Sequence, residues 1–162
     1  MKNAKNWPYL AGIYDGEGCF HIARFVPYGK QTGYRLDMHV TTTSLALAKY
    51  LHQTFGGNYY HIPSNNEKWR DAYRWQPSGK KNKEELILGM LPYLIIKRAL
   101  ANLCLEFLRL GNRNVPQERE RLCQESRVYS RRGRSVETDT LDSKEMIQSE
   151  LQGDLQSAPI EI

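Results

Sequence analysis

The chain has 162 residues, of which 40% are hydrophobic and 25% are charged, a composition typical of one soluble globular domain. No apolar stretch approaches the roughly 18 residues that a membrane-spanning helix needs. The first residues lack the apolar run of a signal peptide, so we expect no secretory signal. Three cysteines, Cys19, Cys104 and Cys123, are too few and too scattered for a disulfide framework or a CxxC metal knuckle. We therefore expect an intracellular protein, in a compartment that the sequence does not specify.

The net charge of +5 is unevenly distributed along the chain. Residues 1–110 hold 15 basic and 8 acidic side chains, whereas residues 135–162 hold one lysine and seven acids. A basic body favours a polyanion such as nucleic acid as its partner, although a generic basic enzyme has the same balance.

The first half of the chain predicts a helix, two strands and a second helix. Residues 7–15 form the first helix, with Pro8 in its first turn and Gly16-Glu17-Gly18 at its end. From Cys19 the hydrophobic pattern changes to a period of two, which predicts a strand. After a polar loop over residues 27–33, alternation resumes over residues 35–41. Ser44 then caps a helix that continues to about Phe55.

The second half repeats the order of two strands followed by helices. We expect strands over residues 59–62 and 69–76, a short helix over 84–91, a longer helix that Pro92 starts and that ends near Leu110, and a charged helix over 116–130. Short loops between strands predict hairpins. The fold class is therefore α+β, with a largely antiparallel four-stranded sheet and helices on one of its faces.

The other face of that sheet is expected to be polar and basic. Alternation places the following side chains on one surface: Arg35, His39, His61, Arg70 and Arg74. A curved antiparallel sheet is wide enough to lie along a major groove and to contact base edges with such groups.

One nine-residue stretch carries a recognisable motif. Residues 10–18 read Leu-Ala-Gly-Ile-Tyr-Asp-Gly-Glu-Gly, which matches LAGLIDADG at most positions. Residues 91–97 read Leu-Pro-Tyr-Leu-Ile-Ile-Lys, similar to the second signature of the same family, a proline-led helix that carries a lysine. From Trp7 to Leu110 the sequence thus resembles the LAGLIDADG homing endonucleases, and its single motif resembles their homodimeric class.

The resemblance implies the αββαββα fold of that family, with a four-stranded saddle-shaped sheet. It implies an endonuclease domain over residues 1–134, followed by a polar acidic extension over 135–162 that is irregular or a short helix. The expected activity is hydrolysis of both strands of DNA at a long pseudo-palindromic site, which leaves short 3′ overhangs. The setting implied is the mobility of an intron or a similar element.

The motif also has a physical reading of its own. Gly12 and Gly16 lie four residues apart on one helical face, and Pro8 lies one turn earlier, so two such helices can approach closely. We expect Pro8, Ala11, Gly12 and Gly16 to form a dimer interface across a two-fold axis. Two Glu17 carboxylates would then converge and repel each other. A divalent cation resolves that conflict.

The candidate catalytic residues are Glu17 and Lys97. Asp15 and Glu17 both stand at the helix end, and the resemblance selects Glu17 as the metal ligand, with the Gly16 carbonyl beside it and Asp15 in a structural role. Mg²⁺ is the expected cofactor, and Mn²⁺ or Ca²⁺ are expected to be able to occupy its site. The resemblance places Lys97 near the scissile phosphate, and Arg98 is the alternative cation. In residues 42–46, the small hydroxyl side chains and Ala46 stand where the family often has larger amide or guanidinium groups.

The expected DNA-binding residues share a place on the polar sheet face or its loops: Cys19, His21, Arg24, Tyr28, Lys30, Arg35, Asp37, His39, Thr41, His61, Arg70, Arg74 and Gln76. Phosphate contacts are expected from Lys30, Lys80, Lys81, Lys83 and the helix over 117–134. The partners are double-stranded DNA and a second copy of the chain, with no membrane and no small-molecule substrate. Two alternatives stay open: an RNA-binding intron maturase without cleavage, and a DNA-binding regulator.

Overall fold

The computed structural model describes residues 4–28, 31–111 and 113–132. Its four strands form one antiparallel sheet in the order β1-β2-β4-β3. The strands are β1 (Gly18–Phe25), β2 (Gly33–Thr42), β3 (Asn58–Ile62) and β4 (Ala72–Gln76). The helices are α1 (Trp7–Gly16), α2 (Leu45–Phe55), α3 (Lys80–Met90), α4 (Arg98–Leu110) and α5 (Pro116–Arg132). The predicted α+β class and the predicted αββαββα order are confirmed. The extension predicted over 135–162 lies outside the described residues.

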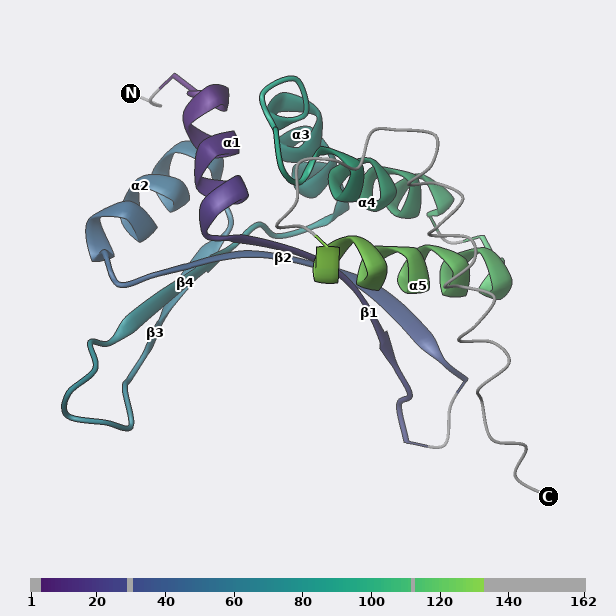
Figure 1. The fold of residues 1–162 in the computed structure, drawn as a ribbon, viewed down its shortest axis with the longest axis horizontal. Helices are drawn as coiled ribbons and strands as arrows, with labels where there is room; N and C mark the ends of the chain where they lie inside the picture. The colour runs from purple at the N-terminus through teal and green to yellow at the C-terminus, as the bar shows by residue number, and fades with distance from the viewer. Residues whose placement is uncertain (1–3, 29–30, 112, 133–162) are drawn as a thin grey trace.

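The sheet is an arch that carries the helices on one side (Figure 1). The pairs β1–β2 and β3–β4 diverge below the helices as two arms. They are joined where β2 pairs with β4 at only three positions, Val40↔Trp75, Thr41↔Arg74 and Thr42↔Tyr73. The open side of the arch, opposite the helices, is called the concave face below.

The core lies between the sheet and the helices. Phe20 and Ile22 of β1 and Leu36, Met38 and Val40 of β2 are buried, as their alternation predicts. Trp75 of β4 is fully buried as well, and its indole Nε1 donates to the Gly56 carbonyl at 2.8 Å. Burial of these side chains contributes roughly 1.5–3 kcal/mol each, so the arch depends on its helical cover.

Local signals start and end the first two helices. The Asn6 side chain accepts the Tyr9 backbone N–H at 3.1 Å and caps α1. Ser44 accepts the Leu47 N–H at 3.2 Å and caps α2. Gly56 ends α2 with a φ of +75°, a left-handed conformation that glycine adopts without a steric penalty.

Three predicted boundaries are wrong. Helix α3 begins at Lys80 rather than at Glu84, and α4 begins at Arg98 rather than at Pro92. Residues 91–97 form a turn instead, in which a side chain from α1 binds two backbone N–H groups. Strand β4 begins at Ala72 rather than at Trp69, because the Asp71 carboxylate accepts the Ser64 N–H at 2.9 Å and closes the preceding loop.

Within the part of the chain that the structure describes, no helix combines the length and the hydrophobicity needed to cross a bilayer.

Candidate nucleic-acid interface and catalytic centre

One side of α1 is not covered by the rest of the described chain. Pro8, Gly12 and Gly16, spaced four residues apart, are exposed along it. A Cβ atom added at Gly12 or at Gly16 meets no other atom within 4 Å. The glycines are therefore not needed for packing inside one chain, and they leave a flat helical surface that a second helix can approach.

The predicted role of Ala11 in a dimer interface is wrong. Its side chain is completely buried in the core of its own chain, together with Leu10 and Tyr14. The helical period explains this placement: Ala11 lies one position from Gly12, about 100° around the helix, and faces the core. The exposed side of α1 is thus limited to Pro8, Gly12 and Gly16 among the four predicted interface residues.

Glu17 stands at the exposed end of this side. It is the C-terminal cap of α1, and its backbone N–H donates to the Ile13 carbonyl at 2.7 Å. Strand β1 begins at the next residue, Gly18. A Cβ at Gly18 would lie 2.4 Å from the Tyr14 ring, so only glycine permits this tight passage from helix to strand. The passage presents the Glu17 carboxylate at the junction of α1 and the sheet.

Lys97 reaches the same junction from the turn before α4. Its ammonium donates to the Tyr14 carbonyl and to the Gly18 carbonyl, each at 2.6 Å. Burial lowers the pKa of Lys97, while the nearby charges of Asp15, Cys19 and Glu17 act in the opposite direction. A cation is therefore fixed within electrostatic range of Glu17 and is half-buried beside it.

Asp15 fixes the backbone of this turn. Its carboxylate accepts the N–H of Ile95 at 2.8 Å and the N–H of Lys97 at 3.0 Å, one on each oxygen. Arg98 is held by the same turn, because its guanidinium donates to the Leu94 carbonyl at 2.9 Å. Of the two acids that the sequence left open, Asp15 has the structural contacts and Glu17 is the one exposed.

The chemistry of the oxygen donors suits a hard divalent cation. One chain brings together one exposed carboxylate, that of Glu17, and the neighbouring backbone carbonyls at the end of α1. Among the described residues, no group of three or more His, Cys, Asp and Glu side chains gathers to hold a metal ion. The donor set of one chain is thus too small by itself, and it fits Mg²⁺ when further oxygens come from a second chain and from phosphate groups.

The register places most of the predicted DNA-binding residues on the concave face. Cys19 pairs with His39, His21 pairs with Asp37, and Thr41 pairs with Arg74. Directly paired residues share a face, and alternate residues of a strand return to it. The predicted residues on this face are Cys19, His21, Arg35, Asp37, His39, Thr41, Arg74 and Gln76.

A pocket of about 330 Å³ hollows this face where the two arms meet. Arg35, Asp37, Arg74 and Lys83 line it, with His39 beside them. Burial lowers the pKa of His39, and the Arg74 guanidinium acts in the same direction. Three cations against one carboxylate give the pocket a positive field suited to an anionic or acceptor-rich ligand.

The predicted placement of Arg24 and His61 on this face is wrong. Arg24 shares the parity of Phe20 and Ile22, and it points to α5, where its Nε lies 3.9 Å from a Glu120 oxygen. His61 pairs with Tyr73, two positions along from the buried Trp75, so it faces the helical side of its arm. Its Nε2 lies 2.7 Å from the Asp71 carboxylate.

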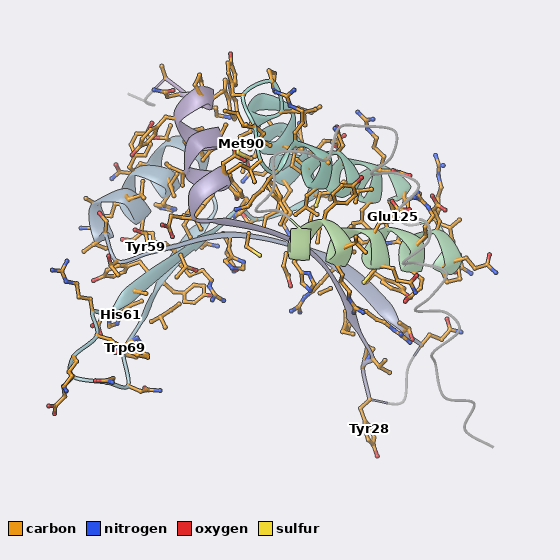
Figure 2. All side chains as sticks on the ribbon, viewed as in Figure 1. Tyr28, Tyr59, His61, Trp69, Met90 and Glu125 are labelled. Atoms are coloured by element: carbon orange, nitrogen blue, oxygen red, sulfur yellow. The ribbon has the colours of Figure 1, made fainter. Side chains whose placement is uncertain are left out.

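The loops of the arms hold the rest of the predicted residues. Tyr28 is fully exposed at the far end of the β1–β2 arm (Figure 2). Arg70 lies in the loop that precedes β4, next to the exposed Trp69, rather than on a strand. Lys30 lies outside the described residues.

Three concave-face features were missed or misjudged from the sequence. Phe25 continues the alternation of Cys19 and His21, and this signal was available. Tyr60 joins the pocket because it pairs with Arg74, a register that no sequence pattern specified. Lys83, predicted to contact phosphate, donates to the Leu36 carbonyl at 2.6 Å and lines the pocket.

No family model and no curated protein sequence matches the chain. Solved structures do match its fold. The homing endonuclease I-CvuI in complex with its target is 19% identical, with a TM-score of 0.59 and coverage of 83% of each chain. The group I intron-encoded homing endonuclease I-CeuI complexed with DNA is 15% identical, with a TM-score of 0.60 over 78% of this chain and 68% of that chain.

A third similar structure differs in length. The LAGLIDADG homing endonuclease I-GzeII in complex with a DNA target is 17% identical, with a TM-score of 0.58. The match covers 78% of this chain and only 44% of I-GzeII. With the motif of residues 10–18 in α1 and Glu17 at its end, the arched sheet and its helical cover make this protein one with the LAGLIDADG homing endonuclease fold.

Proposed function

We propose that this protein is a site-specific DNA endonuclease that acts as a homodimer and hydrolyses both strands of its target with a divalent metal ion. The observation that carries the proposal is the uncovered side of α1, which ends in the exposed Glu17 with Lys97 anchored beside it. Similar structures are complexes of homing endonucleases with DNA, two of them in the presence of Ca or Mg, and they support this function.

The homodimer explains the incomplete donor set. If the Gly12 and Gly16 faces of two copies meet across a two-fold axis, each α1 delivers a Glu17 carboxylate to the centre of the assembly. The concave faces of the two copies then continue one another along a duplex. The match to less than half of the I-GzeII chain is consistent with two units of this size in one complete enzyme.

In the proposed hydrolysis each residue would have a separate role. Glu17 from each copy and the Gly16 carbonyl would hold Mg²⁺, or Mn²⁺ or Ca²⁺ in its place. Bound divalent cations supply a more acidic water and stabilise the negative charge that develops on phosphate oxygens. Lys97 keeps a positive charge beside the phosphate, where it stabilises the same developing charge. Asp15 keeps Lys97 in place. The two-fold axis would give one cut on each strand, and the resemblance implies that these cuts leave short 3′ overhangs.

The concave face would bind the duplex. Its outward side chains are long enough to reach base edges in the major groove, and its cations attract the phosphate backbone. The duplex would have to be long enough to span the concave faces of both copies. The target is therefore expected to be long and pseudo-palindromic.

The experiment compares wild type with Glu17→Gln and with Glu106→Gln as the matched control. Glu106 lies on α4 and pairs with Arg121 at 2.6 Å, away from the concave face. Duplexes that wild type enriches from a random-sequence pool are incubated with each protein and Mg²⁺. We expect Glu17→Gln to bind these duplexes without cutting them, and Glu106→Gln to cut them as wild type does.

Other results would assign another function. If wild type enriches duplexes and never nicks them, the protein is a DNA-binding regulator on this scaffold. If it binds structured intron RNA and ignores duplex DNA, the RNA maturase reading replaces the endonuclease. Cleavage by Glu17→Gln at the wild-type rate would contradict the assigned catalytic residue.

A further inference from the structure

The concave surface of the β1–β2 arm contains a prearranged group of four residues. Arg35 and Asp37 lie two positions apart on β2 and share the concave face. The Arg35 Nε lies 3.1 Å from one Asp37 oxygen and 3.3 Å from the other. The Arg35 side chain is 66% exposed and that of Asp37 is 36% exposed, so the pair is open to a ligand.

An aromatic ring also contacts the guanidinium. The Arg35 Cζ lies 5.8 Å from the centroid of the Phe25 ring, within the range of a cation–π contact. The ring takes this place because Gly33, its partner in the hairpin, has no side chain: a Cβ there would lie 2.5 Å from the Phe25 ring. Four residues from two strands thus cooperate to hold one guanidinium.

In this geometry the two terminal nitrogens of the Arg35 guanidinium, its outer edge, are free to bind a ligand. Among the described residues, Arg35 makes its polar contacts with its Nε group. Its Nη1 and Nη2 groups therefore stay available as two donors. These two donors can bind two acceptors that lie side by side. Guanine offers such a pair in the major groove, its O6 and N7.

The nearby carboxylate argues for a base rather than a phosphate. A phosphodiester anion at the outer edge of Arg35 would also be repelled by Asp37, whose oxygens lie within about 4 Å of the guanidinium. A neutral acceptor pair meets no such repulsion. An acid on a face that binds a polyanion is electrostatically unfavourable, and its role in orienting Arg35 explains its presence there.

We infer that Arg35, positioned by Asp37 and Phe25, selects a guanine at one position in each half of the target. The inference rests on the proposed DNA-binding function and adds to it a specific base and the residues that select that base.

The test is a binding selection with the full chain on a random-sequence duplex pool in the presence of Ca²⁺, followed by sequencing of the bound duplexes. Wild type is compared with Arg35→Lys, which keeps the charge and removes the two-pronged donor. The matched control is Arg24→Lys, the same change on the opposite side of the sheet. We expect wild type and Arg24→Lys to enrich one guanine per half-site, and Arg35→Lys to lose that preference on the order of tenfold at that position alone.

A second variant tests the positioning role. We expect Asp37→Asn to weaken the guanine preference at the same position that Arg35→Lys affects, while total binding of the pool stays equal or rises. A change at a different position would mean that Asp37 contacts a base of its own, such as the amino group of cytosine, and would overturn the positioning role.

Failure of this inference can be distinguished from failure of the proposed function. If wild type enriches no sequence and retains no duplex, the proposed function fails and this inference fails with it. If wild type enriches a motif that Arg35→Lys leaves unchanged, the DNA-binding function stands and only the assignment of Arg35 is overturned.

Discussion

The Asp15 carboxylate accepts the backbone N–H of Lys97 at 3.0 Å, across 82 positions of sequence. The contact ties the end of α1 to the turn before α4, so the residue next to the helix end determines where Lys97 stands. Because the Lys97 ammonium then donates to the Tyr14 and Gly18 carbonyls, the cation and Glu17 belong to one rigid unit.

Removing the Asp15 contact with this turn should lower both the stability and the activity of the protein. Asp15→Ala leaves the N–H groups of Ile95 and Lys97 without their acceptor, and we expect it to lower the free energy of unfolding by about 1–3 kcal/mol. Asp15→Asn keeps one acceptor oxygen and should lie between Asp15→Ala and wild type. Urea unfolding measures the stability, and single-turnover cleavage measures the activity. Wild-type values for both in Asp15→Ala would contradict the structural role of Asp15.

Gly12→Leu should separate the dimer without unfolding the chain. A side chain at Gly12 meets no atom of its own subunit within 4 Å, and leucine is favoured over glycine in a helix by roughly 0.5–1 kcal/mol. We therefore expect a folded monomer by sedimentation velocity. Asn102→Leu, which also places a leucine on an exposed helical surface, that of α4, is the control and should remain dimeric. An intact Gly12→Leu dimer would place the association elsewhere.

DNA binding should become tighter as the pH falls, through His39. In the free chain, burial and then Arg74 lower the pKa of His39. A phosphate backbone near this face opposes the effect of Arg74 and raises the pKa of His39 in the complex. A group whose pKa rises on binding takes up protons, so affinity increases as the pH falls through that range.

His39→Gln should reduce this pH dependence, and His52→Gln, on the exposed side of α2, should leave it unchanged. Fluorescence anisotropy of a labelled duplex between about pH 5 and 8, a window around the ordinary pKa of histidine, provides the measurement. Equal slopes in His39→Gln and wild type would exclude His39 as the group responsible.

Salt should weaken binding steeply. A concave face that neutralises several phosphates releases condensed counterions, and affinity should fall on the order of 10³-fold between about 50 and 200 mM salt. Titration of the enriched duplex at four ionic strengths gives the slope. A flat response would mean that the basic face does not lie along the phosphate backbone.

Much of the fold could be predicted from local patterns. The alternation of β2 and the caps at Asn6 and Ser44 are properties of neighbouring residues, and the structure places these elements as expected. The start of α4 could not be predicted this way. Pro92 is a good first residue of a helix, yet the helix begins at Arg98 because Asp15, far away in the sequence, takes up the N–H groups of the turn.

In the candidate site, too, local patterns predicted some features, and features that depend on distant residues could not be predicted. The motif predicted Glu17 at the end of a helix, and the resemblance predicted Lys97 near the scissile phosphate; the structure brings both residues to one junction. The face assignments of Arg24 and His61 failed, because they depend on the cover that α5 provides and on the register of β3 with β4. The prediction that Ala11 lies in the dimer interface failed for a related reason. The motif shows which residues of the helix are small, but only the folded structure shows that Ala11 is buried inside its own chain.

The central claim is that two copies of α1 meet and bring their Glu17 carboxylates together at bound cations over the DNA. The most direct measurement is a crystal structure of the protein with an enriched duplex and Mn²⁺, in which anomalous scattering locates the metal. We predict Mn²⁺ within coordination distance of Glu17 from both copies, at the centre of the duplex. Anomalous peaks remote from Glu17, or two Glu17 side chains on opposite ends of the assembly, would contradict the account.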